Sequence, residues 1–239
     1  NNINIFIRFA DEEEFAFPRS SYDWQFNDID GPSLNHYFLE VSNNNLEVNT
    51  THYPACDLDA NLSYQDEHPR SYYQLHHPQT NPGGYFECPQ WQGDSDINCD
   101  EIDPSQWGSY REHALLKNAV DFIENEVPDE LDVDANDDGY VDNVTFLVNG
   151  SPDGWAELLW PHRWSLYLYD AYINGALVDG YNLNLSSGGY YTVGVLCHEF
   201  GHSLGAPDLY RYYDDSLTPV GEWDLMGWNT SPNPQYPSA

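Results

Sequence analysis

One short segment, TVGVLCHEFGHSLG at residues 192–205, dictates much of the architecture around it. Its apolar residues recur at helical spacing: Val193, Leu196, Phe200 and Leu204. The segment therefore predicts an amphipathic helix of about three turns, and the remaining chain must supply a surface that covers its apolar stripe. Thr192 is placed to cap the start of this helix, and Gly205 is placed to end it.

The same helix carries His198 and His202 four residues apart. Residues at that spacing share one helix face with their Cβ atoms about 5–6 Å apart, from which two imidazoles reach one metal ion. Zn²⁺ held by three protein groups keeps a position for water, whose pKa it lowers from about 15.7 to about 7. Glu199 is placed to take the proton of that water. We therefore expect His198 and His202 as zinc ligands and Glu199 as the general base of peptide-bond hydrolysis.

The continuation HEFGHSLGAPD supplies a candidate third ligand. Gly205 lacks a Cβ atom and allows a sharp bend, after which Asp208 can return to the metal. Asp214 and Asp215 are the alternative candidates for this position. Further along, Met226 in EWDLMGW falls where a methionine-containing turn could form the floor of the site, although plain core packing also explains a buried methionine.

An acidic segment upstream follows the spacing D-x-[DN]-x-[DN]-G of a calcium-binding loop, in which alternating oxygen ligands wrap the ion. The candidate ligands are the side chains of Asp134, Asn136, Asp138 and Asp142 and the carbonyl group of Tyr140. Gly139 permits the bend. The twelfth residue of the loop is Thr145 rather than glutamate, so the segment is not a complete EF-hand. A solvated acidic turn is the alternative interpretation.

The rest of the chain predicts a mixed α/β domain. Alternating apolar and polar residues of β-branched and aromatic types indicate strands over 3–10, 46–53, 142–150, 164–169 and 177–185. Helical spacing indicates helices over 34–41, with Ser33 as the N-cap, and over 110–126. Between 52 and 108, Pro, Gly, Asn, Asp and Gln are frequent without sustained periodicity, which predicts a loop-rich excursion and not a separate domain.

The charge balance restricts the partners. Seven Lys and Arg residues against forty Asp and Glu give a formal charge of −33. Such a field repels phosphate backbones and anionic lipids, so neither nucleic acid nor membrane is an expected partner. Solvation of the surface explains the acidity most simply, with attraction of cationic substrates as the alternative. No apolar run approaches the roughly 18 residues of a membrane span, and the first residues lack signal-peptide features, so any targeting segment is expected to be gone.

The four cysteines contain no C-x-x-C pair, which argues against a thiolate zinc site. They are Cys56, Cys88, Cys99 and Cys197. An even number favours disulfides outside the cell, with three possible pairings. Proximity suggests Cys88 with Cys99, and Cys197 can equally be a buried free thiol.

Residues 188–229 resemble the active region of the immune inhibitor A-like metalloproteases, a secreted bacterial family of metzincin-like zincins. The matching text is TVGVLCHEFGHSLGAPDLY followed by TPVGEWDLMGWN, and weaker likeness covers INIFIRFAD, LNHYFLEVSNNNLEV, DANDDGYVD and WPHRW. The resemblance implies endopeptidase activity on proteins, zinc, calcium and release as an inactive precursor. Asp208 stands where many metzincins have a third histidine. The larger family members also carry a propeptide and further C-terminal domains, so the chain resembles an excised or matured catalytic domain.

Three further residues are candidates for the substrate cleft. His162, in WPHRW, is expected on a strand edge before the active helix, where it either lines the cleft or has a structural role. Tyr210 and Tyr213 follow Asp208 and are candidates to donate a hydrogen bond to the oxyanion.

Together these patterns predict a single catalytic domain over 1–239 with an α/β (α+β) zincin fold. A twisted mixed sheet, a backing helix and the active helix form an upper subdomain over 1–205, and 206–239 form a smaller lower subdomain with the Met-turn and the cleft between them. A secreted monomer is expected, with a protein or peptide substrate extended along the sheet edge. The competing hypothesis is a calcium-stabilised secreted binding module with a degenerate, inactive peptidase fold.

Overall fold

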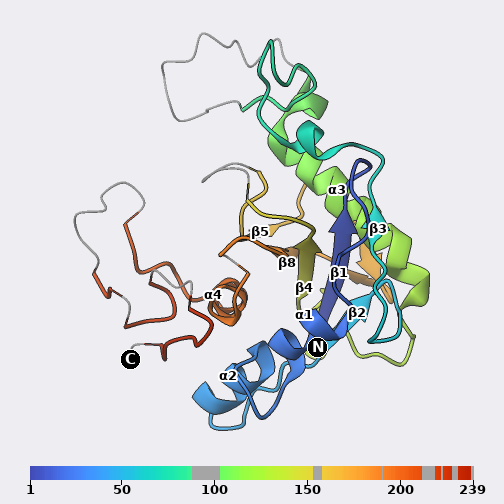
Figure 1. The fold of residues 1–239 in the computed structure, drawn as a ribbon. Helices are drawn as coiled ribbons and strands as arrows, with labels where there is room; N and C mark the ends of the chain where they lie inside the picture. Colours follow the sequence, from blue (N-terminus) through green and yellow to red (C-terminus); the bar gives the residue numbers. More distant parts are fainter. Residues whose placement is uncertain are drawn as a thin grey trace.

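The chain forms a mixed α/β structure, as predicted, in which a sheet separates the long helix α3 from helix α4 (Figure 1). The computed structural model describes residues 1–87, 103–152, 158–189, 191–211, 219–221, 223–227 and 231–237. Among the helices in these ranges, none is long and apolar enough to cross a membrane.

The main sheet of the described residues has six strands. They are β1 (Asn2–Arg8), β2 (Thr50–Tyr53), β3 (Tyr64–Gln65), β4 (Val144–Val148), β5 (His162–Ser165) and β8 (Gly180–Leu185). The order is β2-β1-β4-β8-β5, and β3 pairs with the far end of β1. All pairs are parallel except β5 with β8, so β5 is an antiparallel edge strand. A separate hairpin joins β6 (Tyr172–Ile173) to β7 (Ala176–Leu177).

The two faces of the sheet bury different chemistry. The four α-helices of the described residues are α1 (Ser20–Asn27), α2 (Leu34–Val41), α3 (Gly108–Ile123) and α4 (Val193–Ser203). On one face, Ile3, Ile5 and Ile7 of β1 join the large apolar cluster that includes Leu116 and Val120 of α3. Because side chains alternate along a strand, the intervening Asn2 and Asn4 point to the other face.

Helix α4 covers this second face and packs against α2 on its other side (Figure 1). Val193, Leu196 and Phe200 of its predicted apolar stripe are buried, and the ring of Phe200 lies 4.9 Å from that of Phe38. Leu204, the fourth residue of the predicted stripe, is 54% exposed. At the end of α4, the hydroxyl group of Ser203 donates to Asn143 Oδ1 at 2.8 Å and shares a 2.9 Å hydrogen bond with the side chain of Asn182. These polar contacts fix the last turn of the helix against β8 and the start of β4.

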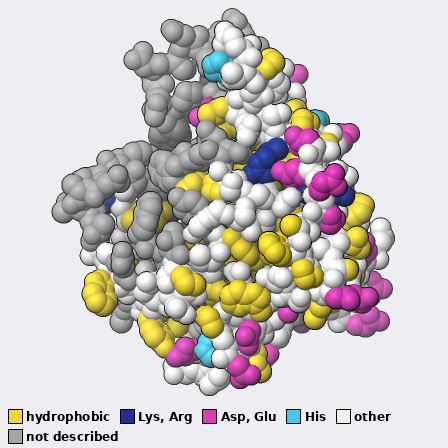
Figure 2. Space-filling view, in the orientation of Figure 1, with side chains coloured by type: hydrophobic (Ala, Val, Ile, Leu, Met, Phe, Trp, Pro, Cys, Tyr) yellow, Lys and Arg dark blue, Asp and Glu magenta, His cyan; other side chains and the backbone are white. Residues whose placement is uncertain are grey.

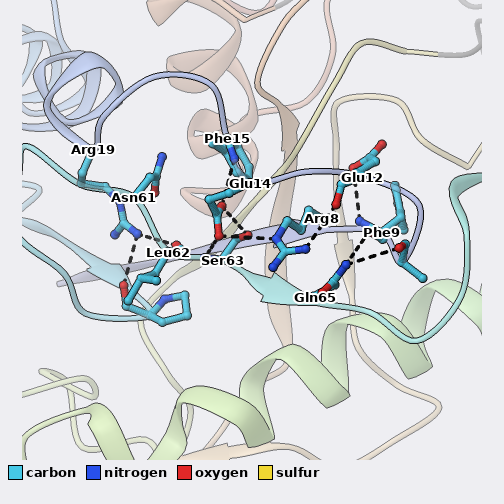
Figure 3. A network of polar contacts seen from close by, with 12 residues as sticks. Arg8, Phe9, Glu12, Glu14, Phe15, Arg19, Asn61, Leu62, Ser63 and Gln65 are labelled. Atoms are coloured by element: carbon cyan, nitrogen blue, oxygen red, sulfur yellow. Dashed lines mark hydrogen bonds and ion pairs between the residues drawn. The ribbon is translucent and has the colours of Figure 1, made fainter.

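The excursion after β2 is tied back to the sheet by charged side chains (Figure 3). Arg8 pairs with Glu14, whose carboxylate accepts hydrogen bonds from the backbone and hydroxyl group of Ser63. Arg19 is almost completely buried and donates to the side chain of Asn61 and the carbonyl of Leu62. This part of the excursion is therefore anchored in the α/β unit.

Most predicted elements are present, and three predicted strands differ most in their limits. The strand predicted over 46–53 begins only at Thr50, because Thr50 pairs with Asn2, the first residue of β1. The backbone N–H of Val48 donates instead to the side chain of Asn35 at 3.1 Å. The strand predicted over 164–169 is β5 at 162–165, the stretch that pairs with β8. The strand predicted over 177–185 is divided between β7 and β8. Helix α1 and the β6–β7 hairpin were not predicted.

The cysteines are unpaired where the structure describes them. Cys56 and Cys197 are free thiols, so the expected disulfides do not involve these two residues. Burial raises the pKa of the Cys197 thiol well above its ordinary value, which keeps it protonated. Cys88 and Cys99 lie outside the described residues.

Acidic side chains are spread over the face seen in Figure 2, and Lys and Arg occur in few places there. The carboxylates are dispersed and do not form a single patch on that face. This distribution fits the expected solvating role of the acidity.

The N-cap of α4 makes a testable contribution to stability. Thr192 accepts a hydrogen bond from the backbone N–H of Val195 at 3.2 Å. We predict that Thr192→Ala lowers the free energy of unfolding by about 1 kcal/mol and that Thr192→Ser, which keeps the acceptor, has a much smaller effect. Urea unfolding measures both. Equal losses in the two variants would show that the cap does not stabilise the helix.

Candidate metal centre

Three side chains converge beside the C-terminal half of α4. The Nε2 atoms of His198 and His202 lie 3.2 Å apart, and Asp208 Oδ1 is 3.1 Å from the first and 3.3 Å from the second. In the described part of the chain, this is the group of three His, Cys, Asp or Glu residues whose donor atoms lie within 4.8 Å of one another. The structure therefore brings together the three residues predicted as zinc ligands.

The backbone fixes the protonation of both imidazoles. His198 Nδ1 lies 2.9 Å from the carbonyl oxygen of Leu225, and His202 Nδ1 lies 2.8 Å from that of Ala206. A carbonyl oxygen only accepts, so each Nδ1 carries a proton, and in the neutral ring each Nε2 presents a lone pair toward Asp208. Histidine ligands of metals are commonly held in this way. The donor set thus fits a divalent cation.

Two turns supply these carbonyl groups. Gly205 has φ +89°, a left-handed conformation that glycine adopts without strain, and the resulting bend returns Ala206 to His202. The second turn contains Asp224, Leu225 and Met226, and the carboxylate of Asp224 accepts from the backbone N–H of Met226 at 2.7 Å. This turn corresponds to the predicted Met-turn.

Met226 packs directly beneath the active helix. It is 4% exposed, and its sulfur lies 2.9 Å from where a Cβ atom of Gly201 would stand. Gly201 lies between His198 and His202 in the sequence, and its missing side chain allows Met226 to pack closely against the helix at this point. The backbone carbonyl of Met226 also accepts from Leu209 N at 2.8 Å, which holds the segment after Asp208.

Glu199 is 6% exposed and follows His198 on the helix. Burial raises the pKa of its carboxyl group above the ordinary value, although the nearby histidines pull in the opposite direction. For His198, burial alone lowers the pKa, but the hydrogen bond to Asp208 and the charge of Glu199 outweigh it. A metal must displace protons from such histidines, so its affinity falls at acid pH.

A cleft of about 640 Å³ opens in front of these residues. Helix α4 and the turn after it form one side, and residues 160–164, which include most of edge strand β5, form another. Trp164 is 57% exposed on that strand. Tyr210 also lines the cleft, with its ring nearly parallel to that of His198 at 6.3 Å.

His162 begins β5 at the cleft, but it is not available as an oxyanion donor. Its Nδ1 lies 2.6 Å from the carbonyl oxygen of Trp160, and its Nε2 lies 3.0 Å from the carboxylate of Glu112 on α3. Sequence reasoning missed Glu112, because fifty residues separate it from His162 and it lies on a helix read for its apolar face. Asp224 was also missed, although an aspartate two residues before the methionine is a turn signal.

The acidic loop is closed on itself. The carboxylate of Asp134 accepts from the backbone N–H groups of Asp138 and Gly139 at 3.0 and 2.8 Å, and the amide of Asn136 donates to Asp138. The Asp142 carboxylate accepts from the backbone of Ala135. Its carboxylates do not form a group of three within 4.8 Å among the described residues. Tyr213, Asp214 and Asp215 lie outside those residues.

The C-terminal part of the chain is similar to a known family. Residues 127–232 match the family model described as immune inhibitor A peptidase M6, catalytic domain. The matched segment contains the acidic loop, β5, α4, Asp208 and the turn with Met226. No curated protein matches the chain.

The ligand set can be tested by titration with Zn²⁺. We predict that Zn²⁺ at about 100 times its Kd stabilises the protein by about 2.7 kcal/mol. Asp208→Asn removes the charge but little volume and is expected to weaken Zn²⁺ binding at least about tenfold. Asp121→Asn, which removes the same charge from the exposed side of α3, is the control. Thermal unfolding with and without Zn²⁺ measures the effect, and equal stabilisation of the two variants would exclude Asp208 as a ligand.

Proposed function

We propose that this chain, a member of the immune inhibitor A peptidase M6 family over residues 127–232, is a secreted zinc-dependent endopeptidase. The family match makes it a metallopeptidase. The observation that carries the finer proposal is the convergence of His198, His202 and Asp208, with both histidine tautomers fixed by backbone carbonyl groups. A set of two imidazoles and one carboxylate is typical of catalytic zinc sites with an open position.

The three proposed ligands would hold the metal, and Glu199 would transfer the proton. Zinc, when bound by His198, His202 and Asp208, supplies an acidified water and polarisation of the scissile carbonyl group. Glu199 accepts the proton of the attacking water on its carboxylate and returns it to the leaving nitrogen. Its raised pKa suits both steps, because the carboxylate is then a stronger base toward the attacking water and the resulting carboxylic acid can still donate the proton to the leaving nitrogen.

Substrate binds in an extended conformation along β5. Among the described residues this strand is the edge of the sheet, and it lines the cleft, so its outer side can accept an added strand. The exposed indole ring of Trp164 offers an apolar surface beside it. Tyr210 is the described residue that we propose as donor to the oxyanion, since it lines the same cleft and His162 already uses both ring nitrogens.

The acidic loop serves as a calcium site in this proposal. The left-handed residues Asp137 and Gly139 give it a tight bend, and Asn136, Asp138 and Asp142 line a shared cavity. A hard cation would take the place of the backbone N–H groups that now hold these oxygens. Protein or peptide is the partner, and we propose a monomer that binds neither nucleic acid nor membrane.

A degenerate binding module is the competing function. That function would require a missing catalytic residue, whereas Glu199 is present and buried next to the proposed ligand His198. The peptidase proposal is therefore favoured. Cleavage of casein that o-phenanthroline abolishes and Zn²⁺ restores would exclude the binding module.

Glu199→Gln tests the general base. The variant keeps the volume and polarity of the side chain but cannot take a proton, so we predict that it binds Zn²⁺ like the wild type and loses at least about 100-fold in kcat. Casein cleavage and zinc content by elemental analysis measure the two properties. Glu130→Gln, at an exposed position, is the control for the lost charge. Substantial activity in Glu199→Gln would remove this residue from its proposed role.

The calcium loop is tested through stability. We predict that Ca²⁺ raises the melting temperature of the wild type and that the double variant Asp134→Asn, Asp138→Asn loses this response, because two of the charged oxygen ligands are gone. The variant should still bind Zn²⁺. A melting temperature that does not respond to Ca²⁺ in the wild type would leave the loop as a solvated turn.

A further inference from the structure

Glu112 is a buried carboxylate outside the proposed ligand and base set. It lies on α3 with 6% of its surface exposed, on the face of the sheet opposite α4. It accepts hydrogen bonds from the hydroxyl group of Tyr181 and from His162 Nε2 at 3.0 Å. A buried charge without partners is costly, so this carboxylate requires the cation beside it.

His162 is that cation. Its Nδ1 faces a backbone carbonyl oxygen at 2.6 Å and its Nε2 faces the Glu112 carboxylate, and both of these groups accept. Both ring nitrogens therefore carry protons, which makes the ring an imidazolium. Burial alone lowers the pKa of His162, but the charge of Glu112 and the two hydrogen bonds outweigh it and raise the pKa to about 9.

The pair is oriented with respect to the cleft. His162 lines the cleft and its side chain is 29% exposed, whereas its partner Glu112, on α3, is only 6% exposed. Arg163, the next residue, turns its guanidinium group over Gly180, with Nη2 2.9 Å from where a Cβ atom would stand. The imidazolium of His162 is thus the positive end of an ion pair in the wall of the cleft.

The charged and titratable groups around His162 come from every element packed against it. Glu112 and His113 face it from α3, Tyr181 from β8 and Glu199 from α4. Tyr181 stays protonated because burial, the largest effect, raises its pKa far above the ordinary value. Burial likewise lowers the pKa of His113. His113 is then neutral where His162 is charged. The other cation of this wall is Arg163, which also lines the cleft and whose guanidinium group lies over Gly180.

We propose that Glu112 is a positioning residue of the site, which holds His162 as a fixed cation in the cleft wall, where it favours the negative charge that develops on the substrate carbonyl during hydrolysis. This role rests on the proposed function. Because both ring nitrogens already have partners, His162 acts through its charge and not by a direct hydrogen bond to substrate. A fixed charge at a site shielded from water acts more strongly than one in solution.

The sign of the pH dependence follows from the pair. The charge on His162 is present below its folded pKa and is lost as the pH rises through about 9, so activity falls on that alkaline limb. Without the Glu112 carboxylate, burial dominates and the cation is lost at a lower pH. The alkaline limb should then move down.

Glu112→Gln tests this in the full, zinc-loaded protein. We expect a loss of about tenfold in kcat near about pH 8 with little change in KM, and an alkaline limb at least about one pH unit lower. Glu112→Asp keeps the charge and should retain most of the wild-type limb. Glu124→Gln, which removes one charge from the exposed residue after α3, is the control. If Glu112→Gln does not fold, His162→Gln should show the same loss in kcat and no limb near 9.

An NMR titration of the His162 ring provides a readout that does not depend on activity. We expect it to titrate near 9 in the wild type and at least about one pH unit lower in Glu112→Gln. An unchanged alkaline limb or an unchanged His162 titration in Glu112→Gln would overturn the inference. If the wild type failed to cleave peptides at all, the proposed function would fail instead, and the NMR titration would still report on the ion pair.

Discussion

Two hydrogen bonds from imidazole rings to backbone carbonyl groups hold the arrangement on which the rest of the site depends. His198 and His202 each donate from Nδ1, and this leaves both Nε2 atoms directed at Asp208. The two carbonyl groups belong to different turns, one after Gly205 and one before Met226. The segment that follows α4 is therefore part of the metal centre, because its backbone selects the tautomers of residues on the helix.

The sheet determines where α4 can present those residues. The α3 face of β1 and β8 is apolar, whereas the other face carries a buried row of asparagine and threonine side chains, among them Asn143, Thr145 and Asn182. Apolar packing alone would allow α4 to slide along its axis, because apolar contacts are not directional. The hydrogen bonds of Ser203 to Asn143 and Asn182 do have direction, and they fix the turn that contains His202.

The sequence was sufficient where the cause of a structure is local. The caps at Ser33 and Thr192, the bend at Gly205 and the stripe of α4 up to Phe200 each depend on neighbours within a turn or two, and all are present. Strand limits were predicted less well, since β5 is defined by pairing with β8 and the start of β2 by pairing with the start of β1. For the same reason, the periodicity of the sequence cannot predict the ion pair between Glu112 and His162. It arises only when α3 is placed behind the edge strand.

The formal charge of −33 and a cationic cleft wall are compatible because charge acts over different distances in the two places. Exposed carboxylates act through water and are screened beyond about 8–10 Å at moderate ionic strength. The pair of Glu112 and His162 is neutral as a whole, so it adds nothing to the distant field, but its positive end is the one that meets the cleft. The chain can thus keep a strongly acidic, solvated surface beside a cleft wall that carries positive charge, and the net charge alone does not describe the site.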